Sequence, residues 1–200
     1  MTLKSLIALA GIVAVACIVT TFSQSLSGFN TSQCGGTKRC INIPENCQIQ
    51  GNCQYQISYA PSRDGKSMII ELFGRRDSPQ MQYVAIGFSS DARMGNEPVA
   101  ACIAGPNGQA QLSYSYNQEG KRNIPLGPIN PSDAQLLSSA VTESSIYCQF
   151  SQAINPTTNP SLPNLQRPFQ LLVARGPVQS NGQLGHHTSR QPTSFMTQMA

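Results

Sequence analysis

The chain after Cys53 is a succession of short segments in which apolar and polar residues alternate. Alternation with a period of two is typical of a β-strand with one buried face, because successive side chains point to opposite sides. Asp-Gly and Asn-Gly turns separate several of these segments, and no stretch sustains a helical period. We therefore predict an all-β sandwich or barrel, with strands at 55–60, 66–74, 82–89, 98–104, 109–116, 144–151 and 169–176. The segment 131–141 is expected to be a strand or loop edge.

The first 23 residues have the parts of a secretory signal peptide. Lys4 supplies the positive charge, residues 6–19 form the apolar stretch, and small residues Thr21 and Ser23 precede a cleavage site before Gln24. The apolar stretch is shorter than the roughly 20 residues that a membrane-spanning helix needs, and the C-terminus lacks the hydrophobic tail of a lipid-anchor signal. We predict a secreted, extracellular protein with no membrane span of its own after cleavage.

Cysteine usage agrees with export. Cys17 belongs to the predicted signal peptide, and an even number of cysteines in an exported chain indicates disulfides, whose pairing the sequence leaves open. Four cysteines fall within "CGGTKRCINIPENCQIQGNC", where we expect a cross-linked lobe with little secondary structure and not a zinc site. The other two lie in predicted strands, where a bridge between strands is favoured over free buried thiols. The expected disulfide cysteines are Cys34, Cys40, Cys47, Cys53, Cys102 and Cys148.

The domain organisation follows from these segments. After the signal peptide (1–23), we expect a cysteine-rich lobe (24–54) packed on a β-sandwich (55–192), and a short C-terminal tail (193–200). Asn30 in "NTS" is a predicted glycosylation acceptor. The formal net charge is +4, but the charged residues are scattered, so a nucleic-acid partner is not supported.

The usual signatures of side-chain catalysis are missing. The sequence has no G-x-S-x-G nucleophile motif, no phosphate-binding glycine loop and no carboxylate pair at a recognisable spacing. We therefore do not expect enzymatic turnover by side chains alone.

Two loops carry residues that can bind a metal. Met94 interrupts the polar segment "SSDARMGNE", and both histidines, His186 and His187, lie in the glycine-rich segment 176–192. Methionine and histidine are a known axial pair for haem iron. A blue-copper site would need a cysteine thiolate and two well-separated imidazoles, and a zinc site would need more ligands. From composition and spacing alone, a methionine that fills the core and a pair of solvated histidines are favoured over a haem site.

The segment "YVAIGFSSDARMGNEPVAAC" (83–102) resembles the hallmark of the DOMON family, in which a strand, a short loop, Met-Gly, an acid or amide and a second strand follow one another. The cysteine-rich segment 34–53 resembles the lead-in of the ferric-chelate reductase (stromal-cell-derived receptor) branch. Residues 171–192 resemble the closing segment of that branch, in which a strand, Gly-Pro, Asn-Gly and a histidine recur.

The resemblance implies an immunoglobulin-like β-sandwich with haem b at one end. Met94 matches the thioether ligand of the cytochrome members, and His187 matches the imidazole ligand, with His186 as the second choice. Tyr83, Phe88 and Phe169 are expected to form the walls of the pocket. Haem would be held non-covalently, because the chain has no C-x-x-C-H attachment motif.

The function that the resemblance implies is that of a one-electron carrier. In the related branch a transmembrane cytochrome core follows the domain, whereas this sequence stops at Ala200. We therefore expect the redox partner to be a separate membrane cytochrome or another redox protein, which any ferric reductase activity would require. The alternatives are a cofactor-free extracellular module that binds a carbohydrate or a partner protein, and a structural extracellular component.

Overall fold

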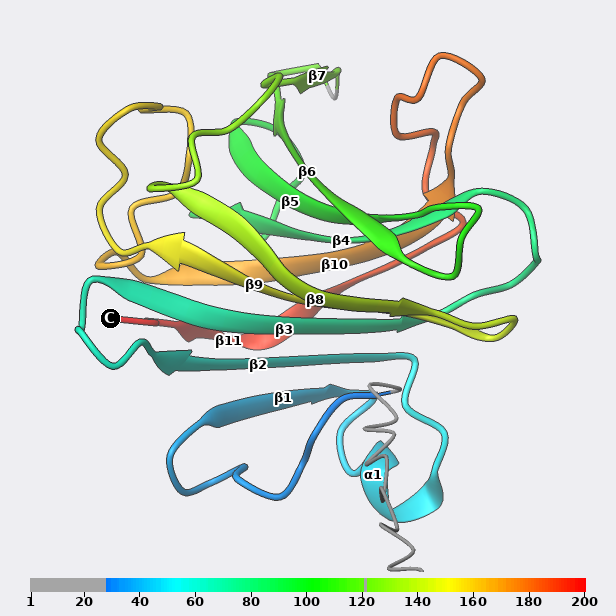
Figure 1. Ribbon diagram of the computed structural model, residues 1–200, viewed down its shortest axis with the longest axis horizontal. Helices are drawn as coiled ribbons and strands as arrows, with labels where there is room; N and C mark the ends of the chain where they lie inside the picture. The colour runs from blue at the N-terminus through cyan, green and yellow to red at the C-terminus, as the bar shows by residue number, and fades with distance from the viewer. Residues whose placement is uncertain (1–27, 121) are drawn as a thin grey trace, which may run out of the picture.

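The protein is a sandwich of two antiparallel sheets (Figure 1). A computed structural model describes residues 28–120 and 122–200, so the predicted signal peptide lies outside the described residues. The strands are β1 (Arg39–Ile43), β2 (Tyr55–Pro61), β3 (Ser67–Arg75), β4 (Gln82–Ser89), β5 (Glu97–Ala104), β6 (Ala110–Asn117), β7 (Asn123–Pro125), β8 (Ala134–Val141), β9 (Ser145–Ala153), β10 (Phe169–Pro177) and β11 (Ser189–Thr197). Among these residues the one helix is α1 (Cys47–Gln50).

The first sheet has the strand order β1-β2-β3-β9-β8, and the second has the order β11-β10-β4-β5-β6-β7. Every neighbouring pair of strands is antiparallel. This architecture confirms the predicted all-β sandwich with a disulfide-rich N-terminal lobe. All seven strands predicted from alternation are present, and their ends differ from the predicted ends by two residues at most.

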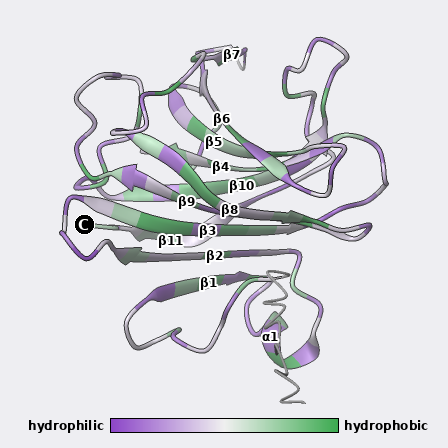
Figure 2. Ribbon diagram, in the orientation of Figure 1, coloured by the Kyte–Doolittle hydropathy of each residue, from purple (hydrophilic) through white to green (hydrophobic). Residues whose placement is uncertain are grey.

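The main core lies between the two sheets, and Figure 2 shows hydrophobic residues concentrated in strands such as β3 and β10. Strand β4 contributes Val84, Ile86 and Phe88 to this interior, as its alternation predicts. The disulfide Cys102–Cys148 joins β5 of one sheet to β9 of the other, which confirms the expected bridge between strands. Burying one face of each sheet against the other is the main stabilising contribution in such a fold.

The N-terminal lobe is more regular than the sequence indicates. Its disulfides are Cys34–Cys40 and Cys47–Cys53, and between them β1 adds an edge strand to the first sheet. The expectation of little secondary structure is wrong here, because Ile41 and Ile43 alternate with polar residues and both enter the core. The lobe therefore supplies part of the sandwich itself.

A buried ion pair fastens the lobe to the first sheet. The Nζ of Lys38 donates to Glu71 on β3, and the same carboxylate accepts hydrogen bonds from Ser58 and, at 2.9 Å, from the Tyr147 hydroxyl. Both charged residues are buried. A buried charge is tolerated when it is paired and hydrogen-bonded.

The last residues form a strand where we expected a tail. Strand β11 runs to Thr197, and Met199 is buried in the main core. Thr193 is buried as well, and its hydroxyl accepts a hydrogen bond from the backbone N–H of Leu171 at 3.1 Å. Residues 193–200 are thus part of the sandwich, in contrast to the predicted boundary at Pro192.

The proline-rich loop between β9 and β10 is an ordered part of the fold. The buried carboxylate of Asp133 accepts hydrogen bonds from the backbone N–H groups of Thr157, Thr158 and Asn159 and from the Thr158 hydroxyl. Leu165 of the same loop is fully buried.

Within the described part of the chain, no helix has the length and apolar character that a membrane span requires.

Candidate functional site: a cavity on the outer face of the second sheet

A cavity of about 1190 Å³ lies on the outer face of the six-stranded sheet, away from the main core. Its floor is formed by strands β4, β5 and β10. Two segments that rise above the sheet in Figure 1, β7 and the arm at 178–188 between β10 and β11, form walls of the cavity. The loop at 90–96, between β4 and β5, forms another wall. Ligand pockets in proteins commonly measure about 300–1,000 Å³, so this cavity suits a large ligand.

Part of the floor consists of small side chains. Ala85 on β4 lies between Ala101 on β5 and Ala174 on β10 in the sheet register. Its neighbour on the same face is Gly87, where an added Cβ would be 3.3 Å from the Cγ of Glu97 and 3.5 Å from the Cβ of Leu172. These positions alternate with the core residues of β4, so one strand serves both the interior and the cavity.

The wall that carries Met94 is a tight, internally bonded turn. Three residues around Met94 have positive φ angles, namely Ala92 (62°), Gly95 (126°) and Asn96 (63°). Asp91 stabilises this turn by accepting a hydrogen bond from the backbone N–H of Arg93 at 3.0 Å. Non-glycine residues with positive φ are uncommon and cluster at functional sites, and here they present a half-buried thioether to the cavity.

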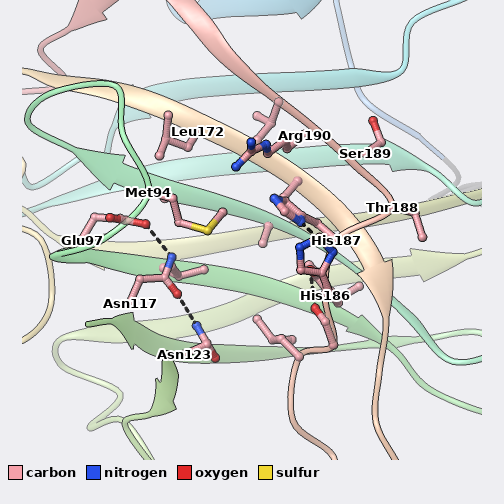
Figure 3. Close-up of a pocket in the computed structure, with 18 of the residues that line it drawn as sticks. Met94, Glu97, Asn117, Asn123, Leu172, His186, His187, Thr188, Ser189 and Arg190 are labelled. Atoms are coloured by element: carbon pink, nitrogen blue, oxygen red, sulfur yellow. Dashed lines mark hydrogen bonds between the residues drawn. The ribbon is translucent and has the colours of Figure 1, made fainter. Parts of the chain in front are cut away.

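Glu97 anchors the same turn from below. One oxygen of its carboxylate accepts the N–H of Gly95 and the other accepts the side-chain amide of Asn117, each at 2.5 Å. The amide oxygen of Asn117 in turn accepts a hydrogen bond from Asn123 on β7 at 2.8 Å. Burial raises the pKa of Glu97 above its ordinary value, and the bonds from Asn117 and Gly95 oppose this rise. The chain of bonds in Figure 3 therefore connects the Met94 turn to the β7 wall.

The arm that carries the histidines lies directly on β10. A Cβ atom added to Gly176 would be 2.9 Å from the Cα of His187 and 3.0 Å from the carbonyl oxygen of His186. The backbone of the histidine pair approaches this closely only because position 176 has no side chain. Glycine at this position therefore fixes how near the imidazoles come to the floor.

Hydrogen bonds hold both sides of the histidine pair. The Tyr83 hydroxyl donates to the carbonyl of Gly185 at 3.0 Å, and burial raises the pKa of Tyr83 to about 12, so this donor keeps its proton. On the other side, the N–H of Thr188 donates to the carbonyl of Arg175 at 2.9 Å. The Arg175 side chain forms an ion pair with Asp77 at 2.9 Å.

The two imidazoles differ in exposure and contact each other. His186 is exposed, whereas His187 is half-buried and its Nε2 atom is buried. Their rings pack edge to face with centroids 4.4 Å apart, and their Nδ1 atoms are 3.4 Å apart. Figure 3 shows the thioether of Met94 extending toward the side of the cavity that holds both histidines. Sequence reasoning singled out these three residues, and the fold brings all three to one cavity.

Two of the predicted pocket walls lie elsewhere. Tyr83 lines the cavity, but Phe88 and Phe169 pack against each other in the main core with ring centroids 5.5 Å apart. The prediction that these two phenylalanines line the site is wrong for this cavity, because Phe88 points to the opposite face of the strand from Gly87. The expected position at one end of the sandwich also changes, since the cavity lies on the outer face of a sheet.

Three arginines line the cavity and were not singled out from the sequence. Arg93 comes from the Met94 turn, Arg122 from the loop before β7, and Arg190 from β11. All three are exposed. They lie far apart in the sequence, and only the sheet order brings them together, so no local charge pattern could have revealed them. Glu97 was detectable in principle, as the acid that follows Met94-Gly95-Asn96.

The donor set suits the iron of a planar macrocycle. A thioether on one wall and an imidazole on another are ligands that haem iron accepts, and ligands from facing segments can hold a flat ring between them. The exposed arginines that line the cavity would offer positive charge for its carboxylates. Among the described residues, no group of three or more His, Cys, Asp and Glu side chains forms a metal site.

Comparisons with known proteins place the sequence in a family. The DOMON domain profile matches residues 51–176. Putative ferric-chelate reductase 1 of Danio rerio is 34% identical over 163 residues, which cover 80% of this chain and 27% of that protein. The DOMON domain-containing protein FRRS1L of Homo sapiens is 28% identical over 163 residues, which cover 80% of this chain and 52% of that protein. The chain thus spans about half or less of the length of these relatives.

A solved structure shares the fold. The cytochrome domain of Myriococcum thermophilum cellobiose dehydrogenase is similar to this chain with a TM-score of 0.57, and the match covers 82% of this chain and 83% of that domain. The sequence identity is 11%, so this likeness concerns the fold alone. The sequence profile, which matches more than half of the chain, shows that the chain belongs to the DOMON domain family.

Proposed function

We propose that the protein is a secreted DOMON domain that binds haem b without a covalent bond and carries single electrons. The observation that carries the proposal is the convergence of Met94 and the histidine pair on one cavity from two separate segments of the chain. A methionine that merely filled the core would not need a turn with three positive φ angles around it. The three disulfides among the described residues agree with an oxidising, extracellular compartment.

In this proposal Met94 and His187 would be the side chains that hold the haem iron. Haem b held by a thioether and an imidazole supplies one reversible electron, and the thioether raises its reduction potential. The protein's own residues orient the cofactor and set its surroundings. With both side chains bound to the iron, a substrate would find no free position there, which is why we propose a carrier and not an enzyme. The arginines of the cavity would hold the propionate groups.

The redox partner in this proposal is a membrane cytochrome or another redox protein. The relative from Danio rerio carries the name ferric-chelate reductase and is much longer than this chain. A carrier of this kind would deliver or accept electrons at such a partner, and any reductase activity would belong to the pair.

The ligand assignment is tested by absorption spectroscopy of three haem-loaded variants. We expect Met94→Ala and His187→Ala each to lose low-spin coordination, because each removes one axial donor. His186→Ala, the matched control in the same arm, is expected to stay low-spin. An unchanged spectrum in either of the first two variants would reject that ligand. Loss of low-spin coordination in His186→Ala alone would move the ligand by one residue.

A further inference from the structure

Arg175 links the histidine arm to parts of the protein that lie far from the arm in sequence. We infer that Arg175 is a positioning residue, which joins the N-terminal lobe to the arm at 178–188 and so fixes where His186 and His187 lie over the floor of the cavity. Arg175 is not among the residues that line the cavity, so it acts through its neighbours. The consequence for haem rests on the proposed function, whereas the position of the arm can be measured without haem.

The guanidinium of Arg175 is held by two elements outside the second sheet. Its Nε and Nη2 atoms contact the two carboxylate oxygens of Asp77, in the loop between β3 and β4, at 3.0 and 2.9 Å. Its Nη1 atom donates to the side-chain oxygen of Gln54, the last residue of the lobe, at 2.9 Å. The Arg175 side chain is only 13% exposed. Two-pronged contacts between arginine and a carboxylate combine strength with a fixed geometry, so the guanidinium is a rigid connection.

The same group of residues holds the arm where it joins β11. Thr188 and Ser189 directly follow the histidine pair (Figure 3). The backbone N–H of Thr188 donates to the carbonyl of Arg175 at 2.9 Å. The Thr188 hydroxyl lies 3.2 Å from the Asp77 carboxylate and 3.3 Å from the same carbonyl, and can donate to either. Both the backbone of Arg175 and, through Asp77, its side chain therefore act on the residue next to the histidines.

A buried tyrosine of the first sheet fixes the following residue. The hydroxyl of Tyr55, on β2, lies 2.9 Å from the hydroxyl and 3.2 Å from the carbonyl oxygen of Ser189 and donates there. The Cζ atom of Arg175 lies 5.6 Å from the centroid of the Tyr55 ring. A cation at this distance is attracted by the electrons of the ring face. The tyrosine that anchors Ser189 thus also supports the guanidinium, and both anchors of the arm meet at Arg175.

Loss of the guanidinium should loosen the arm and leave the sheet intact. Without it, Asp77 loses the cation that orients its carboxylate, and the Thr188 hydroxyl loses an oriented acceptor. Strand β10 keeps its pairing with β4 and β11, because backbone bonds form that ladder. The backbone bond from Thr188 to Arg175 also remains. The end of the arm then has fewer contacts that hold it, so it should open locally more often.

The first measurement is amide hydrogen exchange in the haem-free protein, with thermal unfolding measured in parallel. Arg175→Gln should make exchange in residues 184–188 about tenfold faster, as expected from the loss of a hydrogen bond to a charged group. We expect the low end of that range, because the Asp77 side chain is 42% exposed and water competes for its carboxylate.

Matched variants separate positioning of the arm from a general loss of stability. Arg75→Gln also removes a guanidinium that binds the lobe, through the carbonyls of Gly51 and Cys53 at 2.9 Å each. Arg75 lies on β3 of the first sheet, so exchange in the arm should not change. Thr188→Val removes only the hydroxyl and should give part of the effect of Arg175→Gln, whereas Thr188→Ser keeps the hydroxyl and should match the wild type.

The second measurement is haem affinity and the absorption spectrum of the haem-loaded variants. Arg175→Gln should bind haem up to about tenfold more weakly, because a loosened arm must be ordered again on binding, and part of the ferric protein should be high-spin. Arg75→Gln should match the wild type. Unchanged exchange of the arm in both Arg175→Gln and Thr188→Val, or exchange that rises as much in β4 and β10 as in the arm, would overturn the inference. A wild type that takes up no haem, while Arg175→Gln loosens the arm as expected, would support the positioning role and refute the proposed function.

Discussion

Replacement of Gly176 by alanine should move the arm that carries the histidines away from β10. Its Cβ would be 2.9 Å from the Cα of His187, 3.0 Å from the carbonyl oxygen of His186 and 3.1 Å from the hydroxyl of Tyr83. Two of these three atoms are backbone, and neighbouring hydrogen bonds hold that backbone on both sides. The clash is therefore relieved only by moving the arm away from β10.

The expected cost in free energy is that of adding one methyl group to a well-packed site. Inserting one methyl group into a well-packed site typically costs about 1–3 kcal/mol. If this cost falls on the arm in its haem-binding position, the affinity for haem drops by about 5- to 150-fold, since about 1.4 kcal/mol corresponds to a factor of ten. The ferric spectrum should also shift toward high spin, because His187 moves with the arm.

The assay is a haem titration followed by absorption, with thermal unfolding measured in parallel. Gly105→Ala is the matched control: its Cβ would be 2.9 Å from the carbonyl oxygen of Gln109 in the turn between β5 and β6, and neither residue lines the cavity. It should lower stability by a similar amount without changing axial ligation. Wild-type affinity and spectrum in Gly176→Ala would refute the claim that this glycine sets the position of the histidines.

Three further predictions concern the support of the site and of the fold. Glu97→Gln should weaken Met94 ligation and lower the unfolding free energy by about 1.5–3 kcal/mol: both carboxylate oxygens accept hydrogen bonds, and an amide can accept only one of them. Equal Met94 ligation in mutant and wild type would contradict this. Tyr83→Phe should loosen the arm, seen as faster amide exchange in residues 184–188, since it removes the bond to Gly185; unchanged exchange would count against it. Burial raises the pKa of Asp133, but the hydrogen bonds that it accepts from Thr158 and its neighbours outweigh burial and lower the pKa below its ordinary 3.8. Its contribution to stability is therefore complete above about pH 4 and is lost as the pH falls further, so acid unfolding should be flatter in Asp133→Asn, and equal slopes would argue against this role.

The strands of the fold were predictable where alternation is strong. Strand β4 reads directly from Val84, Ile86 and Phe88, because a period of two with one apolar face has few other interpretations. Strand β7 was not predicted, because its three residues are too few to show a period of two. Strand β11 was not predicted, because Pro192 and several polar residues are typical of a loop. An edge strand nevertheless tolerates proline.

The site was predictable only in its outline. Met94 stands out because a long apolar side chain in a polar turn is unusual, and the histidines stand out because the sequence has no others. What the sequence cannot reveal is the face on which they meet. Alternation places Phe88 and Gly87 on opposite sides of β4, but only the packing of the sheets decides which side is the interior. The two phenylalanines were assigned to the wrong side for this reason.

The most direct test of the account is a haem titration of the purified, disulfide-bonded protein, followed by absorption spectra before and after reduction with dithionite. The account predicts saturation at one haem per chain, a ferric low-spin spectrum, and sharp α and β bands on reduction that return to the ferric form with an oxidant. A folded protein with all three disulfides formed that takes up no haem would contradict the electron-carrier proposal. The cavity would then be the place to search for a carbohydrate or protein ligand.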